Sequence, residues 1–594
     1  MTDALQRIEV FPEKVLPDAE ALIAEARETA RTVTVQPSPF LSTYEVGCEI
    51  DYKRRCTADQ RVMMHAQIGF RDLDKSRRAW AEIWEALDKA GHRVDRYGIC
   101  LDWSMGYPAA RRKDMPRGTG LIMKDLDDWR ALTGMAPVAP HFGDFVIGTP
   151  AAFENTIAAL LSGSTSIGNL GQYFAFRQPH WDDEIFTTAE SLKAIALTAA
   201  QPVPIIVHSS LDDGFASMFT DLACSLGAIL LEQYIVDDLL GGHSSYSYGN
   251  TYARPDLRLA FQRAAQKVTR TPGTMIYGAT TMYGPNHAEN YAALATYLRI
   301  DIYGERTRPA GHAVNPTPVT EAERIPDIDE IIDVHMFANR LVALESTLDE
   351  VAREDAVDAL ADRIVEGGRR FRANVLTGFE AAGIDITNPF EMLLAIRRVG
   401  SKRLETLFGP GEPAPRRLRG RIPIARSFSI EQLEHDGEGL VNRLARSERD
   451  RIARARLKAC VATTDVHEYG KILVESVLRQ LDVEIIDGGI STDPNDLVDQ
   501  AVTTGADFIA LSSYNGVALQ FFTQLKGELD ARNSSLPVFV GGKLNRIPDG
   551  SNTSLPVDIS EELASAGATV CRSVDSMIAA LAEIARAPRP DTRR

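Results

Sequence analysis

The sequence predicts an α/β protein with two parallel-sheet units in series: a (β/α)8 barrel followed by a smaller doubly wound, flavodoxin-like sheet. The chain has 594 residues, more than a single hydrophobic core usually serves. Short apolar runs alternate with amphipathic helical runs, first over about 250 residues and again near the C-terminus. Because strands that alternate with helices pair in parallel, each series predicts its own parallel sheet.

The predicted barrel spans residues 61–328 and follows a helical extension at residues 1–60. Eight apolar runs predict strands, most of them followed by a helix, and eight is the number that closes such a barrel. These runs are MHAQIGF, YGICLDWS, DFVIG, STSIGNL, PIIVHSS, ILLEQYIV, TMIYGATT and IDIYGE. The helices between them include PAAFENTIAALLS, TAESLKAIALTAA and NHAENYAALATYL.

Three further segments follow the barrel. Residues 329–408 have apolar residues at helical spacing and predict helices. The run LFGPGEPAPRRLRGRIP, residues 407–423, is rich in Pro, Gly and Arg and predicts a linker, which we place at residues 409–451. Residues 452–594 contain the apolar runs LKACVAT, VEIIDGG, DFIALSS, LPVFVGG and ATVCRS with helical runs between them, which predicts the doubly wound sheet.

Composition narrows the class of protein. The formal net charge of −17 argues against nucleic acid or an anionic membrane as the main partner. No apolar run approaches the length of a membrane span, and the polar N-terminus shows no signal peptide. The six cysteines are scattered without a CxxC pair, which favours a reducing compartment over disulfides or a zinc site. We therefore expect a cytoplasmic enzyme with a small-molecule substrate.

Polar residues at the predicted barrel strand ends are the candidate catalytic groups, because chemistry in these barrels occurs on the loops after the strands. The four candidates are Asp102, His208, Glu232 and Tyr234. Tyr107, His243 and Tyr277 are further polar groups of this kind. Each of them taken singly is equally well explained as a structural polar group of the barrel.

The segment TTDVHEYGKIL, Thr463–Leu473, places a histidine on the turn after the first strand of the second sheet. One ring nitrogen of His467 can ligate a metal while the other donates to an acceptor, and Asp465 stands two residues away to accept. Gly470 lets the backbone approach a bulky ligand closely. A lone loop histidine usually has no such role, so the argument depends on further groups at the same edge. These are the serines of SSYNG after the third strand and the glycines of VGGKLN after the fourth.

The combination DxHxxG, serine and GG resembles the cobalamin-binding domain of B12-dependent mutases and methyltransferases. The resemblance implies that His467 replaces the dimethylbenzimidazole base below cobalt and that the displaced nucleotide tail lies between the serine and the glycines. It implies cofactor contacts at Thr464, Asp465, Val466, His467, Glu468, Gly470, Ser512, Ser513, Tyr514, Gly541, Gly542 and Lys543. Tyr514 departs from the family, which often has leucine there.

The barrel resembles the large subunit of glutamate mutase, with the small subunit fused behind it. The matching segments are Ile147–Tyr173 and the run from MYGPNHAENY to NPTPVTEAE. The resemblance implies adenosylcobalamin as cofactor, held between the barrel mouth and the small domain. It also implies Met282, Arg308 and His312 near the adenosyl group, and a 5′-deoxyadenosyl radical that takes hydrogen from the substrate inside the barrel.

The departures from glutamate mutase bear on the substrate. The arginines that grip two carboxylates are absent from the aligned segments AQIGF, LDWSMGYP and GDFVIGTP, and SIGNLGQY lacks the basic glutamate. We therefore expect a radical mutase for a small substrate that is not a dicarboxylate. A corrinoid methyltransferase or methyl carrier is the alternative, and a cobalamin-responsive sensor is a weaker one. A homodimer and a reactivating chaperone are the protein partners left open.

Overall fold

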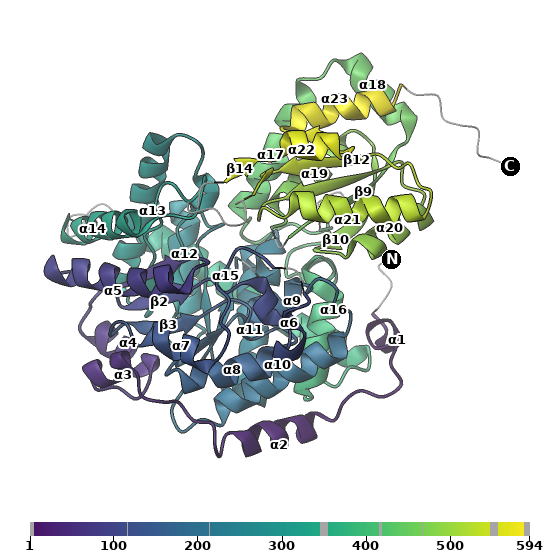
Figure 1. Cartoon of the computed structure of the whole chain (residues 1–594). Helices are drawn as coiled ribbons and strands as arrows, with labels where there is room; N and C mark the ends of the chain where they lie inside the picture. Colours follow the sequence, from purple (N-terminus) through teal and green to yellow (C-terminus); the bar gives the residue numbers. More distant parts are fainter. Residues whose placement is uncertain are drawn as a thin grey trace. The chain divides into compact units, whose positions relative to one another are not determined.

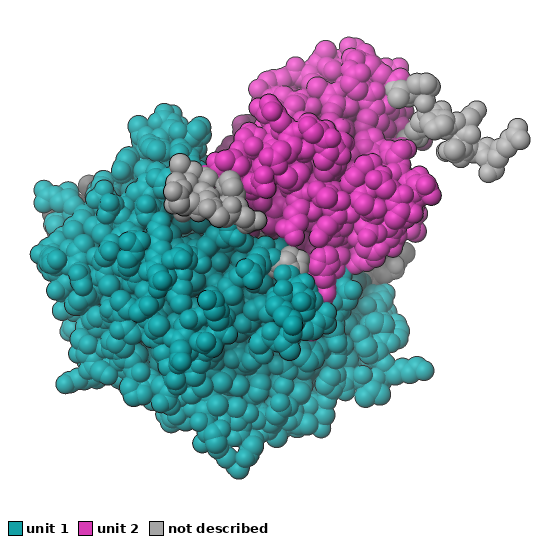
Figure 2. Space-filling view, in the orientation of Figure 1, with its two compact units in different colours: residues 1–178, 182–428 teal, residues 179–181, 429–594 magenta. Residues whose placement is uncertain are grey.

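The computed structural model describes residues 5–115, 117–212, 214–344, 354–414, 419–465, 467–546 and 556–586. The chain forms two compact units (Figures 1 and 2). Unit 1 comprises Met1–Gln178 and Asp182–Phe428, and unit 2 comprises Pro179–Trp181 and Ser429–Arg594. No helix in the described ranges is long and apolar enough to cross a membrane.

Unit 1 contains the predicted barrel of eight parallel strands. Their order around the sheet is β6-β5-β4-β3-β2-β1-β8-β7, and a parallel bridge between Tyr248 and Ile276 joins the two ends. The strands are β1 Met63–Ile68, β2 Arg96–Ile99, β3 Ala139–Phe142, β4 Ser166–Gly168, β5 Ile206–Ser210, β6 His243–Ser247, β7 Met275–Ile276 and β8 Ala313–Val314. The barrel fold is thus confirmed.

Three of the eight predicted strands were wrong. ILLEQYIV lies in the helix α11 Leu222–Gln233 and in the π-helix η3 Tyr234–Leu239 that follows it. IDIYGE lies inside the helix α13 His287–Thr307, and DFVIG follows β3. Every residue of α11 is buried, so the helix has no polar face, and a short apolar run of a fully buried helix cannot be told from a strand by periodicity. The strands that take these places are β6, β8 and β3.

Helices surround the barrel and extend it at both chain ends. The first group is α1 Arg7–Val10, α2 Ala19–Thr29, α3 Pro39–Tyr44, α4 Glu49–Ala58, α5 Leu73–Lys89, η1 Trp103–Gly106, α6 Ala109–Arg112, α7 Leu126–Thr133, α8 Ala152–Leu161, α9 Leu170–Ala175 and α10 Glu184–Ala199. The second group is η2 Phe215–Met218, α12 Pro255–Gln266, η4 Thr280–Met282, α14 Ile328–Leu344, α15 Glu354–Ala381 and α16 Pro389–Phe408.

Helix α5 illustrates how these helices attach to the barrel wall. The Asp72 side chain accepts from the Lys75 backbone N–H and caps the first turn. Trp80, Ile83 and Leu87 recur at helical spacing and are fully buried. Trp80 packs edge-on against Tyr97 of β2, with ring centroids 4.8 Å apart. Each such side chain contributes roughly 1.5–3 kcal/mol by leaving water, so the apolar stripe fixes the helix against the sheet.

Unit 2 is the predicted doubly wound sheet, with strand order β10-β9-β11-β12-β15. The strands are β9 Lys458–Thr463, β10 Glu484–Ile490, β11 Phe508–Ser513, β12 Val538–Gly542 and β15 Thr569–Cys571, with a short hairpin of β13 Asn545–Arg546 and β14 Val557–Asp558. One face packs on α20 Pro494–Thr503, α21 Ala518–Ala531 and α22 Ser560–Ser565. The other face packs on α17 Phe428–Asn442, α18 Arg446–Ala455, α19 Tyr469–Gln480 and α23 Val574–Ile584.

The prediction of a linker at residues 409–451 is correct only in part. Helix α17 and the first turns of α18 fall inside it. Val441 of α17 and Ile452 of α18 are buried in the same core as Val477 and Leu478 of α19. These two apolar anchors stand among many charged residues, which is why composition suggested an exposed connection.

Candidate functional site

The strongest candidate site lies where the strand order of unit 2 reverses. Strands β9 and β11 are neighbours, yet α19 follows β9 on one face and α21 follows β11 on the other. The segments that follow β9 and β11 therefore leave the sheet toward opposite faces at the carboxyl ends of these strands. This is where open α/β sheets bind their ligands. Thr463 at the end of β9 is in register with Ser512 of β11, so the predicted histidine turn and the SSYNG turn share one edge.

Asp465 is the most heavily bonded residue of this edge. Its carboxylate accepts from the backbone N–H groups of Tyr514 (2.7 Å) and Asn515 (3.0 Å) and from the backbone N–H of His467 (3.0 Å). Burial alone would raise the pKa of Asp465, but the His467 side chain and these N–H groups outweigh it and hold the pKa below its ordinary value. Asp465 is thus a buried carboxylate that fastens the β9 turn to the β11 turn.

His467 is oriented by this carboxylate. Its Nδ1 lies 2.8 Å from Asp465 Oδ1, and because a carboxylate can only accept, Nδ1 donates and the lone pair is on Nε2. Neutral imidazole with an acceptor behind it is the usual arrangement of a metal-ligating histidine. The Tyr514 ring lies against the imidazole at a centroid distance of 4.4 Å, and Lys543 Nζ lies 4.3 Å from the centre of the Tyr514 ring.

The glycines of the motif let backbone segments approach closely. A Cβ on Gly470 would lie 2.2 Å from Ser512 Oγ, so only glycine allows α19 to start this close to β11. Gly542 has φ +98°, and a Cβ there would lie 2.2 Å from the Ser513 carbonyl oxygen. The carboxyl ends of β11 and β12 thus form an edge without bulky side chains.

The remaining predicted contacts of unit 2 fall near this edge. Thr464 Oγ1 donates to Ser513 Oγ at 2.8 Å, which links β9 to β11 a second time. Glu468 is buried 3.6 Å from Lys471 Nζ in the first turn of α19. Gly541 is in register with Ser512 on the neighbouring strand. Val466 lies outside the described residues.

These features define a doubly wound ligand-binding domain whose histidine is arranged to ligate a metal beside a flat, glycine-lined edge. Residues 457–549 match the family described as the B12 binding domain. The C-terminal unit is therefore a B12-binding domain.

A solved structure gives a further comparison. A novel cobalamin-binding protein from Desulfitobacterium hafniense DCB-2 is 21% identical, with 26% of this chain and 70% of that chain covered and a TM-score of 0.20.

The residues present fit a cobalamin. A corrinoid needs an axial nitrogen ligand for cobalt and a surface free of side chains for its bulk. His467 would supply the nitrogen, with Asp465 fixing its tautomer. Gly470, Gly541 and Gly542 would leave the space, and Thr464 and Ser513 offer hydroxyls at the same edge.

The predicted barrel residues do not gather in one place. Asp102 caps the short helix η1 after β2, and it accepts from the backbone N–H groups of Ser104 (2.9 Å) and Gly118 (3.1 Å). Tyr234 lies on η3 outside the barrel wall and donates to the Ile386 carbonyl at 3.2 Å. These contacts hold loops and helices together, which assigns both residues structural roles.

Two predicted cofactor contacts lie at the amino end of the barrel. Arg308 and His312 stand between α13 and β8, whereas the prediction treated IDIYGE as a strand and so placed them after it. Arg308 pairs with Asp358 (2.7 Å) and with Glu354 (3.0 Å) on α15, and His312 is buried 3.4 Å from Glu305. A loop that precedes a strand lies at the end opposite the carboxyl ends. Met282 is exposed on η4 after β7, at the carboxyl end.

His208 belongs to a buried histidine cluster that the sequence prediction did not recognise. His65 on β1, His141 on β3 and His208 on β5 come from alternate strands, which contribute to common layers in these barrels. The His141 and His208 rings pack edge-on at 4.5 Å. Burial, helped by the charge of Arg96, holds the pKa of each imidazole well below its ordinary value, so all three are neutral.

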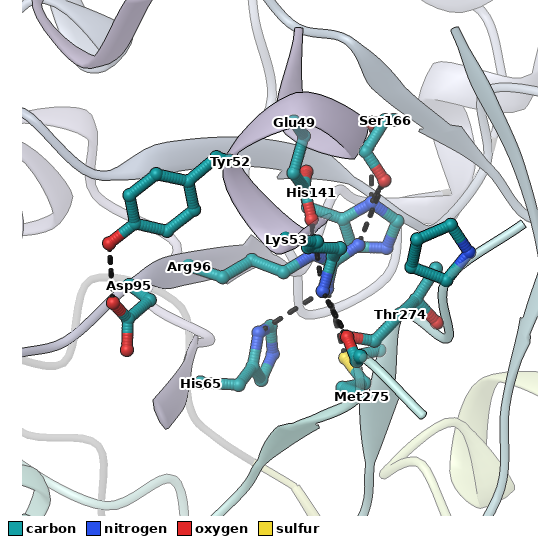
Figure 3. Close-up of polar contacts among 12 residues, drawn as sticks. Glu49, Tyr52, Lys53, His65, Asp95, Arg96, His141, Ser166, Thr274 and Met275 are labelled. Carbon is teal, nitrogen blue, oxygen red and sulfur yellow. Dashed lines mark hydrogen bonds and ion pairs between the residues drawn. The ribbon is translucent and has the colours of Figure 1, made fainter. Parts of the chain in front are cut away.

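Arg96 of β2 connects this cluster to the N-terminal extension (Figure 3). Its guanidinium donates to Glu49 Oε1 of α4 at 2.9 Å and to Ser166 Oγ of β4 at 2.9 Å. His65 Nδ1 lies 3.3 Å from Arg96 Nη1, and His141 Nδ1 lies 3.0 Å from Ser166 Oγ. A histidine in each of β1, β3 and β5 was the signal available in the sequence, but it becomes visible only when β3 is placed correctly.

Glu232 of α11 faces the outside of the barrel wall rather than its mouth. It is fully buried, Oε1 has no hydrogen-bond partner among the described residues, and burial raises the pKa of Glu232 to about 8. Between its ordinary pKa of 4.5 and about 8, the folded chain keeps a proton that the unfolded chain releases. The free energy of unfolding therefore falls as the pH rises through this window.

We expect Glu232→Gln to remove this loss of stability, since the amide has the same shape and does not titrate. Urea unfolding at about pH 4.5 and about pH 8 should show a stability advantage of the variant that grows with pH. Glu380→Gln, an exposed change on α15, is the control and should show no such trend. An advantage that is equal at both pH values would mean that Glu232 is ionised in the folded protein.

Proposed function

We propose that the protein is an adenosylcobalamin-dependent mutase that rearranges a small substrate, other than a dicarboxylate, inside the barrel of unit 1. The observation that carries the proposal is a complete eight-stranded parallel barrel in the same chain as a B12-binding domain. When bound, adenosylcobalamin supplies a carbon radical that can take a hydrogen atom from a substrate. A nearly closed barrel suits such chemistry because it limits the access of water to reactive species.

The chain's own residues have two tasks in this proposal. In unit 2, His467 would supply a nitrogen ligand to the cobalt, and Asp465 keeps the imidazole in the metal-binding tautomer. In unit 1, the strands shield the substrate and orient it through polar groups. His141 supports this assignment, because its Nε2 is buried without a hydrogen-bond partner while Nδ1 lies 3.2 Å from the Ser166 carbonyl. That carbonyl can only accept, which favours the proton on Nδ1 and an acceptor at Nε2.

The charges of the barrel favour a substrate without two carboxylates. Arg96 is the single lysine or arginine in the eight barrel strands, all of whose residues are described, and it is already paired with Glu49. The imidazoles beside it are neutral. A carboxylate clamp needs an unengaged guanidinium, so a hydroxylated, amine-bearing or monocarboxylate substrate suits these strands better.

A corrinoid methyltransferase or methyl carrier is the second candidate, and α17 and α18 are the observation that favours it. A methyl-transferring domain would carry a compact helical cap directly before the B12-binding domain. Two helices stand there and share its core. We rank this candidate second because it gives no role to the barrel.

The deciding experiment is anaerobic EPR of the holoenzyme with adenosylcobalamin and a panel of small hydroxylated, amine-bearing and monocarboxylate compounds. We expect one of them to produce an organic radical coupled to low-spin cobalt. Glutamate should give neither this signal nor 3-methylaspartate, because the carboxylate clamp is absent. Methyl transfer from methylcobalamin to a partner, with no radical signal from the panel, would establish the second candidate instead.

A further inference from the structure

A cationic groove lies on the outer wall of unit 1, apart from the residues considered so far as a functional site. It encloses about 390 Å³ between α11, η3, the end of α12 and α15. Its lining residues are Leu230, Gln233, Asp238, Lys267, Val268, Arg270, Arg369 and Arg372. Four cations and one acid thus face a single hollow, although the whole chain carries a net charge of −17.

Contacts with neighbouring side chains fix the position of two arginines at the rim of the groove, Arg270 and Arg372. Arg372 lies over the Tyr234 ring, with its guanidinium carbon 5.1 Å from the ring centre, and its Nε is buried without a hydrogen-bond partner. The Tyr234 hydroxyl is itself fixed by the Ile386 carbonyl. Asp238 pairs with Arg270 at 2.5 Å and lies 3.9 Å from Arg372. Arg369 has no ion pair with any residue in the described ranges.

The floor adds a second, independent sign of a ligand. Gln233 is only 5% exposed, lines the groove, and its side-chain amide makes no hydrogen bond to the described part of the chain. Its amide atoms reach the solvent of the groove, where they can donate to a ligand. Beside it, Leu230 gives the floor a small apolar surface.

From these contacts we propose that the groove binds a small organic di- or triphosphate. With Asp362, which pairs with Lys267 at 2.6 Å, counted beside Asp238, the four cations exceed the acids by two charges, which suits a ligand with two or three negative charges. Arginine guanidinium groups bind phosphate oxygens in a bidentate manner, and the Gln233 amide can donate to a further oxygen. The apolar floor at Leu230 suits the organic part of such a ligand.

The position of the groove makes it a separate site. Asp238 ends η3 just before β6, and Lys267, Val268 and Arg270 stand between α12 and β7. Residues that precede strands lie at the amino end of the barrel, whereas barrel chemistry occurs at the carboxyl ends. A ligand here would act on the enzyme from a distance rather than take part in the reaction, and its binding does not depend on the proposed mutase activity.

The test is calorimetric titration of the full-length protein with inorganic pyrophosphate, inorganic phosphate and adenosine diphosphate, at low and at physiological ionic strength. We expect saturable binding of pyrophosphate and adenosine diphosphate, weaker at higher salt, and little binding of phosphate. Arg369→Gln and Arg372→Gln should each weaken binding by about tenfold, and Gln233→Met should weaken it less. Arg370→Gln, which removes the same charge from the same helix outside the groove, should leave binding unchanged.

Three outcomes would overturn the proposal. They are no saturable binding of either diphosphate, equal losses in Arg370→Gln and the groove variants, and binding that survives all three groove variants. A fourth outcome, measured by sedimentation velocity, would also overturn the proposal. A salt-sensitive dimer that Arg369→Gln abolishes, together with no diphosphate binding, would assign the groove to an acidic surface of a second copy. Circular dichroism of each variant confirms that it is folded.

Discussion

Replacing His467 with alanine will remove the protein's nitrogen from cobalt and weaken cobalamin binding by more than any other single change in unit 2. The imidazole offers a nitrogen ligand at the switch point between β9 and β11, and Asp465 holds its Nδ1 at 2.8 Å. In the Co(II) form of protein labelled with 15N-histidine, EPR should show hyperfine coupling to the histidine nitrogen in the wild type. The coupling should be absent from His467→Ala.

Asp465→Asn should act in the same direction with a smaller effect, on the order of 10–100-fold in affinity, as changes behind a metal ligand do. An asparagine oxygen can still accept from the Tyr514 and Asn515 N–H groups, which turns its NH2 toward His467. The imidazole would then accept at Nδ1 and carry its proton on Nε2, the wrong tautomer for a metal. His435→Ala, an exposed histidine of α17 in the same unit, is the control and should bind normally. Coupling to the cofactor's own benzimidazole nitrogen in the wild type would refute the ligation.

The site in unit 2 could be predicted from the sequence because its decisive spacing is local. Asp465, His467 and Gly470 lie within six residues on one turn, so their proximity follows from the sequence itself. The contacts from Tyr514 N and Asn515 N to Asp465 could not be predicted, because they join residues about 50 positions apart. The same applies to the Tyr514 ring against the imidazole, which depends on how two strand ends meet.

The barrel could be predicted as a class but not strand by strand. Strand β8 has two residues, Ala313 and Val314, and β3 is APHF, so neither has the length or the alternation that marks a strand. The run IDIYGE inside α13 supplied a false strand in place of β8. This error also moved Arg308 and His312 to the wrong end of the barrel, because the end at which a loop lies depends on whether it follows a strand or a helix.

Loss of a buried charge between α4 and β2 is expected to have the largest effect on the free energy of unfolding. Glu49 and Lys53 of α4 and Arg96 of β2 are each at most 1% exposed. Glu49 Oε1 lies 2.9 Å from Arg96 Nε and 3.5 Å from Lys53 Nζ, so one carboxylate faces two cations. Lys53 also donates to the carbonyl groups of Thr274 (3.0 Å) and Gly311 (2.9 Å), and burial lowers the pKa of Lys53. Removing the carboxylate would leave Arg96 and Lys53 buried side by side.

We therefore expect Glu49→Ala to lower the free energy of unfolding of unit 1 by about 3–5 kcal/mol, the usual cost of breaking a buried pair from one side. Urea unfolding followed by tryptophan fluorescence measures this, because Trp80, Trp84, Trp103 and Trp129 all belong to unit 1. Exposed Glu20→Ala on α2 is the control and should change stability by less than about 0.5 kcal/mol.

The double variant Glu49→Leu with Arg96→Met separates an uncompensated charge from a simple loss of packing. Replacing both partners of a buried pair by apolar groups is often close to neutral, so the double variant should be more stable than Glu49→Ala. If it is equally unstable, the cost comes from the remaining charge of Lys53 or from the shape of the α4 contact, and not from the charge of Arg96. Because Arg96 also holds His65 and Ser166, the double variant should in addition change the NMR signals of the His65 and His141 rings. Unchanged ring signals would show that the histidine cluster is held independently of the α4 ion pair.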